Sequence, residues 1–106
     1  MSGPGKRVQP WNLPGLQRVR RWQQGHTGHH AARHVALGEL PDGRWIAEHA
    51  DLTIGSYTHP TREAAEQQLT EWMWDGEWHE VPAAYKADGQ PYGDGWVRRG
   101  SQWVRS

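Results

Sequence analysis

The chain of 106 residues contains no cysteine and no phenylalanine. Without cysteine the protein has no disulfide, no thiol nucleophile and no cysteine-ligated zinc or iron–sulfur site. It also has no apolar run near the roughly 20 residues that span a bilayer, and its amino terminus has no hydrophobic stretch of signal-peptide type. We therefore expect a cytoplasmic protein with no membrane contact and no thiol-based regulation.

Aliphatic residues are also scarce, since Leu, Ile and Val together occupy 14 of the 106 positions. Eight tryptophans supply the large apolar surface that these residues normally provide. The length fits one domain, so we expect a single small domain with a core built on tryptophan. Arginine outnumbers lysine ten to two and asparagine occurs once, which is typical of a GC-rich bacterial genome.

Charge is distributed unevenly although the formal net charge is zero. Residues 1–38 carry six basic side chains and no acidic one, residues 39–80 have a net charge of −8, and residues 81–106 have a net charge of +2. Such asymmetry accompanies an arm that touches a polyanion, or a basic segment that folds back on its own acidic body.

The amino-terminal third predicts a basic tail over residues 1–30. Residues 1–15 hold three prolines and three glycines, which disfavour both helix and central strand. Between Gly15 and Gly25 the spacing of apolar residues permits a short helix over residues 16–24, marginal in water without a partner. We expect this tail to be largely flexible and the folded domain to cover residues 31–106.

The remainder predicts an α+β fold. Alternation on both sides of Pro41–Gly43 indicates an antiparallel hairpin. A helix is expected over residues 62–74, because Thr61 can cap it and one of its faces is apolar. A second hairpin is expected near the carboxyl end, where Trp-Val-Arg occurs twice, seven residues apart. The predicted core residues are Val35, Leu37, Trp45, Leu69 and Trp72.

Residues 33–74 resemble a known DNA-binding module. The similarity is carried by Gly38, Asp42–Trp45, Thr61–Ala65 and Leu69, and it covers about two fifths of the chain. The chain resembles here the small modules of two or three strands and one helix that precede the catalytic domain of tyrosine-type site-specific recombinases. The resemblance implies a sheet that lies in the major groove of an arm-type DNA site. The sequence departs from the pattern in its acidic strands and in Ala64, where the family has a glutamate.

Four histidines lie within nine residues, at His26, His29, His30 and His34. Imidazole-only sites can hold zinc, copper or nickel. No carboxylate lies within the cluster, and Gly25 and Gly28 argue against a preorganised scaffold. We predict no tight metal site.

Catalytic side chains are present without a catalytic arrangement. His49 near Asp51, and the acidic residues on either side of His79, could act as acids and bases. No nucleophile, base and oxyanion donor occur together, and no glycine-rich phosphate loop precedes a helix. We expect a protein that is not an enzyme and that binds no cofactor.

Tryptophan beside arginine is a nucleic-acid-binding pattern, because indoles stack on bases and guanidinium groups hold phosphates. We predict a small accessory protein that contacts DNA through its basic amino-terminal segment, with Arg18, Arg20, Arg21, Arg33 and Trp22 at the interface. Tryptophan and arginine are also enriched at protein–protein hot spots. The alternative is therefore an interaction module of inhibitor or immunity type that docks a protein partner through an acidic, tryptophan-containing surface.

Overall fold

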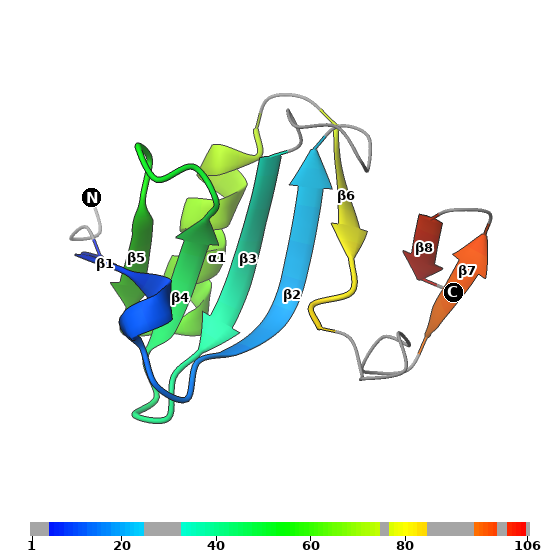
Figure 1. The fold of residues 1–106 in the computed structure, drawn as a ribbon. Helices are drawn as coiled ribbons and strands as arrows, with labels where there is room; N and C mark the ends of the chain where they lie inside the picture. Colours follow the sequence, from blue (N-terminus) through cyan, green and yellow to red (C-terminus); the bar gives the residue numbers. More distant parts are fainter. Residues whose placement is uncertain (1–4, 25–32, 75–76, 85–94, 100–101, 106) are drawn as a thin grey trace.

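The computed structural model describes residues 5–24, 33–74, 77–84, 95–99 and 102–105 (Figure 1). The first half of the chain forms β1 (Lys6–Val8), the short 3-10 helix η1 (Pro10–Asn12), β2 (Gln17–Gln24), β3 (Arg33–Glu39) and β4 (Trp45–His49). The second half forms β5 (Ser56–His59), α1 (Arg62–Trp72), β6 (Trp78–Val81), β7 (Trp96–Arg99) and β8 (Gln102–Arg105). The predicted α+β class is confirmed.

Six strands form one antiparallel sheet in the order β1-β5-β4-β3-β2-β6. The strands β5, β4, β3 and β2 are inner strands, and β1 and β6 form the two edges. The helix α1 packs against β3, β4 and β5 on one face, which lies behind the sheet in Figure 1. We call this the helix face and the opposite side the open face.

The predicted hairpin turning at Pro41–Gly43 is confirmed. Strands β3 and β4 pair antiparallel with Glu39 opposite Trp45, and the turn closes with Leu40 N donating to Arg44 O at 2.9 Å. Gly43 has a φ of 91°, a left-handed conformation that glycine adopts at low cost. The next strand, β5, begins at Ser56, directly after Gly55.

The helix α1 begins where its sequence predicts. The Thr61 side chain accepts a hydrogen bond from Ala64 N at 3.2 Å, and Glu63 stands in the first turn beside the positive end of the helix dipole. The last helical residue is Trp72, two residues before the predicted end, and Met73 N closes the last turn on Leu69 O. Ala65 and Leu69 form the buried stripe.

The core lies between α1 and the helix face of the sheet. Val35, Leu37 and Leu69 are at most 1% exposed, so the prediction of their burial is confirmed. Trp45 and Trp72 were predicted to be buried as well, but each is only half-buried and packs around the edge of this cluster. Their large rings extend beyond the narrow area that a single 11-residue helix covers.

The prediction of a short helix over residues 16–24 is wrong, since Gln17–Gln24 form β2. This strand has two neighbours, β3 and β6, and β1 also joins the sheet, so residues 6–8 and 17–24 belong to the folded domain rather than to a tail outside it. The pairing of β2 with β3 contains a β-bulge between Arg18 and Arg20. The extra residue interrupts the two-residue alternation that would have indicated a strand.

The segment that connects β1 with β2 lies against part of the open face. Leu16 packs over Gly38 so closely that a Cβ on this glycine would come within 2.6 Å of Leu16 Cδ1 and 2.9 Å of Ile46 Cγ2. In Figure 1 this blue segment crosses in front of the sheet, on the side away from α1. The part of the open face nearer to β6 is left uncovered by this segment.

The predicted carboxy-terminal hairpin is confirmed as a pair of antiparallel strands, with Trp96 opposite Arg105 and Val97 opposite Val104. Strand β6, which pairs with β2, was not predicted. Within the described ranges, no helix is long and apolar enough to cross a membrane.

Candidate functional site

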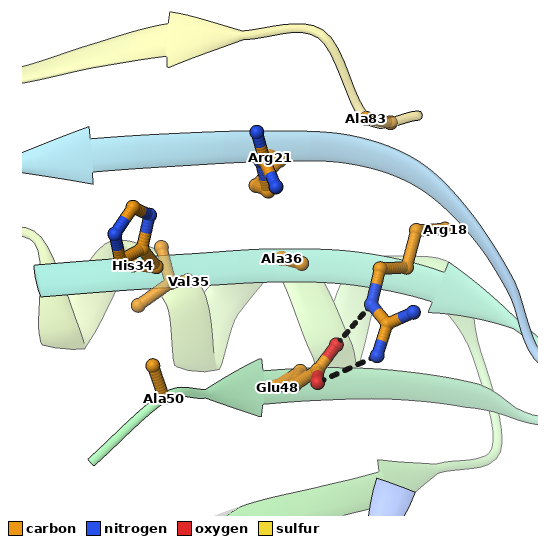
Figure 2. Close-up of a pocket in the computed structure, with 8 residues that line it drawn as sticks. All are labelled: Arg18, Arg21, His34, Val35, Ala36, Glu48, Ala50 and Ala83. Atoms are coloured by element: carbon orange, nitrogen blue, oxygen red, sulfur yellow. Dashed lines mark hydrogen bonds and ion pairs between the residues drawn. The ribbon is translucent and has the colours of Figure 1, made fainter. Parts of the chain in front are cut away.

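A groove of about 270 Å³ lies on the open face of the sheet (Figure 2). Strands β2, β3 and β4 and the segment after β6 build it, and its lining consists of Arg18, Arg21, His34, Val35, Ala36, Glu48, Ala50 and Ala83. Three of these residues are alanines, and their short side chains leave a hollow between the longer polar side chains around them. The groove is therefore a hollow in the sheet surface bordered by charged groups.

The bulge in β2 determines which basic side chains reach this groove. Arg18 pairs with Gly38, whereas Arg20 pairs with Leu37, so the strand gains one residue between them. Side chains on a regular strand alternate between faces, and without the bulge Arg18 and Arg20 would share one face. With the bulge, Arg18 and Arg21 lie together on the open face (Figure 2).

Arg18 is bound to a carboxylate across the groove. Its Nε and Nη2 donate to the two Glu48 oxygens at 2.6 and 2.8 Å, a bidentate ion pair between β2 and β4 (Figure 2). The hydrogen bond to Glu48 is the largest cause of a raised pKa at Arg18. This pair cancels one positive and one negative charge at one end of the groove.

Arg21 stands in the same groove without such a partner. Its Nε is buried and makes no hydrogen bond with any described residue, and no described carboxylate forms an ion pair with its guanidinium. A buried donor left without an acceptor costs on the order of 1–3 kcal/mol. This Nε has almost no accessible surface, so what a ligand in the groove would meet is the unpaired positive charge of the guanidinium rather than this atom.

His34 lines the groove beside Arg21. Its pKa is lowered from the usual 6.5, first because burial disfavours the charged ring and second because the positive charge of Arg21 repels it. The ring is therefore neutral at pH 7, and the groove carries the positive charge of Arg21 beside the neutralised Arg18–Glu48 pair.

The predicted interface residues do not form one site. Arg20 lies on the helix face, where its guanidinium binds both Glu80 oxygens at 2.9 and 3.1 Å and stacks 4.7 Å from the Trp22 ring. Trp22 packs against the core, and the charge of Arg33 acts on His49, on the same side of the sheet. The structure brings together only Arg18 and Arg21 of the five.

Sequence reasoning missed His34 and Glu48 as partners of these arginines. The alternation of β3 and β4 contained a signal for both residues. Positions 35, 37 and 47 belong to the core, so alternation places residues 34 and 48 on the opposite face of the sheet. The sequence did not show which side chains of β2 would lie on that same face.

Acidic residues gather away from the groove. Glu63, Glu66 and Glu71 belong to α1, on the helix face, and Glu80 faces Arg20 there. Glu48 is the one carboxylate in the groove lining. The acidic side chains of α1 and the Glu80 carboxylate therefore lie on the side of the sheet opposite the groove.

No group of three or more potential metal ligands occurs in the part of the chain that the structure describes. His26, His29 and His30 lie outside the described residues, so the prediction of no tight metal site stays a prediction.

Comparisons with models of known protein families, with curated proteins and with solved structures found no match to this chain.

Proposed function

We propose that this protein is a non-enzymatic nucleic-acid-binding accessory protein whose contact surface is the open face of the sheet. The observation that carries the proposal is Arg21, a guanidinium in the groove lining that forms no ion pair with a described carboxylate. Arginine binds phosphate through paired N–H donors, which is the commonest sequence-independent contact to nucleic acids. The resemblance to recombinase arm-binding modules implies the same use of a sheet.

The charge distribution supports this choice of face. A duplex approaching the groove meets Arg21 and the Arg18–Glu48 pair, while the acidic side chains of α1 lie on the other side of the sheet. The structure also reduces the number of phosphate contacts expected from the sequence, because Arg20 is held by Glu80. One or two phosphates neutralised at the groove predict a log–log salt slope of about −1 to −2.

The test is a titration of labelled duplex and single-stranded DNA at two salt concentrations. Arg21→Ala should weaken binding to unrelated sequences alike and flatten the salt slope, the behaviour of a phosphate contact. Arg33→Ala is the matched control, since it removes the same charge from an exposed position on the helix face. Equal losses in both variants, or no binding by the wild-type protein at low salt, would overturn the proposal.

A protein-interaction module is the second candidate, favoured by two exposed indoles. Trp11 and Trp74 are 67% and 81% exposed, although tryptophan is the main apolar residue available for the core. If the protein binds a protein partner rather than DNA, replacing Trp11 and Trp74 with alanine should weaken that complex while Arg21→Ala leaves it intact. The reverse pattern would contradict this second candidate.

A further inference from the structure

We infer that the groove on the open face is a seat for a single phosphate group, held between the Arg21 guanidinium and the His34 ring. The inference rests on the proposed function, because it names the part of a nucleic acid that the groove would hold. The same chemistry fits a backbone phosphodiester and a free phosphate, and these two sources are separated by the experiment below.

The size of the groove fits a small anion. Its volume of about 270 Å³ leaves room for a phosphate group with part of its hydration shell. The groove is also open on one side rather than enclosed, so a phosphate within a longer chain can enter it.

Two side chains offer donors to such an anion from adjacent strands. Arg21 on β2 forms no ion pair with a described carboxylate, and its two Nη groups can present N–H donors to phosphate oxygens, whereas its Nε is buried. His34 stands on β3, diagonally across from Arg21, which pairs with Ala36. The side chain of Ala36 in the groove lining is a single methyl group (Figure 2).

The remaining charged groups on this face do not oppose the anion. Glu48 on β4 is the carboxylate that would repel it, but both of its oxygens are bound by Arg18. On β6, His79 pairs with Gln23 and is exposed beyond the groove, and Val81 stands opposite Arg21. The groups that line the groove therefore sum to one positive charge, carried by Arg21.

Phosphate binding at this position is coupled to protonation of the His34 ring. Burial and the Arg21 charge together keep the His34 ring neutral. A bound anion would offset the Arg21 charge and accept a hydrogen bond from the ring, and both effects favour the imidazolium form. Binding should therefore take up a proton and become tighter as the pH falls below 6.5, the ordinary histidine value.

The experiment is an NMR titration of the full chain that follows the His34 ring and the Arg21 Nε–H. Dimethyl phosphate serves as the backbone-like diester and inorganic phosphate as the free anion, both at constant ionic strength. The pH comparison uses dimethyl phosphate, because its charge is the same at pH 7.5 and 5.5. We expect both signals to shift on titration, with about tenfold tighter diester binding at the lower pH.

Four variants separate this seat from general charge attraction. Arg21→Gln should weaken diester binding at least tenfold, and Arg33→Gln, the matched loss of charge on the helix face, should change it less than twofold. His34→Gln should remove the dependence on pH. Ala50→Leu changes no charge but narrows the groove at an exposed lining position, and it should weaken binding several-fold. Circular dichroism confirms that each variant is folded.

The outcomes distinguish this inference from the proposed function. If neither phosphate shifts His34 or Arg21 while DNA still binds through Arg21, the phosphate seat is wrong and the nucleic-acid function stands. If both phosphates bind as expected but DNA does not, the seat is supported for a free phosphate and the nucleic-acid function falls. Equal weakening by Arg21→Gln and Arg33→Gln would also overturn the seat.

Discussion

Arg20 and Arg21 are neighbours in the sequence and lie on opposite faces of the sheet. Arg20 forms a bidentate pair with Glu80 and covers the Trp22 ring, whereas Arg21 lines the groove and has no ion-pair partner among the described residues. Two side chains of identical chemistry therefore have different tasks. The first fastens the edge strand β6 to β2, and the second carries the unpaired positive charge of the groove lining.

The pair between Arg20 and Glu80 should contribute to stability. Arg20→Ala should lower the free energy of unfolding by about 1 kcal/mol, because it removes a partly buried ion pair and the stacking on Trp22. Urea denaturation measures this loss, and a double-mutant cycle with Glu80→Ala isolates the pairwise part.

The matched control is Arg62→Ala on α1. Its contact with Glu66 is longer, at 3.5 Å, both side chains are more than 40% exposed, and its guanidinium lies 5.2 Å from the Trp45 ring, farther than Arg20 lies from Trp22. We expect a change of no more than about 0.5 kcal/mol from breaking this pair. A larger loss at Arg62 than at Arg20 would contradict the assignment of Arg20 as the fastening side chain.

Stability should fall in mild acid because His49 is buried as a neutral ring. Its pKa is lowered, chiefly by burial, and its Nδ1 accepts a hydrogen bond from Asp51 N at 3.0 Å. The unfolded chain, with a histidine pKa near 6.5, then binds more protons than the folded one, so stability is full above pH 6.5 and decreases below it. Each such histidine contributes a slope of at most about 1.4 kcal/mol per pH unit.

Urea denaturation at pH 7.5, 6.5 and 5.5 tests this dependence. His49→Gln should flatten the decrease, and His34→Gln should flatten it further because the pKa of His34 is lowered in the same direction. A wild-type protein that gains stability between pH 6.5 and 5.5 would show that neither ring is held neutral.

Leu69 and Leu52 provide a direct test of the core. Leu69 is 1% exposed and packs between α1 and the sheet, whereas Leu52 is 63% exposed. Leu69→Ala should destabilise the fold by about 3 kcal/mol, through lost burial and the cavity that remains. Leu52→Ala should cost no more than about 0.5 kcal/mol, and thermal or urea unfolding compares the two.

Two glycines should respond to alanine for different reasons. At Gly43 nothing lies within 4 Å of an added Cβ, so Gly43→Ala should cost about 1 kcal/mol from the left-handed backbone alone. At Gly38 the added carbon meets Leu16 and the buried Ile46, so Gly38→Ala should cost about 1–3 kcal/mol from overpacking. Asparagine adopts the left-handed conformation more readily than alanine, so unfolding measurements should find a smaller loss of stability for Gly43→Asn than for Gly43→Ala. At Gly38, where the added side chain itself causes the loss, asparagine should bring no such relief.

The part of the fold that the sequence predicts is the part held by local patterns. The hairpin of β3 and β4 follows from alternation around Pro41–Gly43, and α1 follows from a capping threonine and one apolar stripe. Each of these signals lies in one short, continuous stretch of the chain. A local pattern is sufficient there because the neighbouring strand or the next helical turn supplies the partner.

Strand β2 could not be predicted because the carboxylates that pair with two of its arginines are distant in the sequence. Arg18 is bound by Glu48 and Arg20 by Glu80, which lie 30 and 60 positions away. The bulge also breaks the alternation that would have indicated a strand, and three basic residues close together resembled an exposed segment. For the same reason the sequence could not show that Arg18 and Arg20 are already paired with carboxylates, or that Arg20 lies on the face opposite the groove.

The bulge at β2 has a consequence for how the chain tolerates change. Because the extra residue lies between Arg18 and Arg20, a deletion of Val19 would remove the bulge and still leave Arg18 opposite Gly38 and Arg21 opposite Ala36. The two groove arginines would then be two positions apart in a regular strand and would keep the same face. A deletion between Arg21 and Gln24 has no extra residue to absorb it, so it would turn the side chains on one side of the deletion to the other face. This inner strand therefore contains one position at which a residue can be lost without moving its side chains from one face to the other.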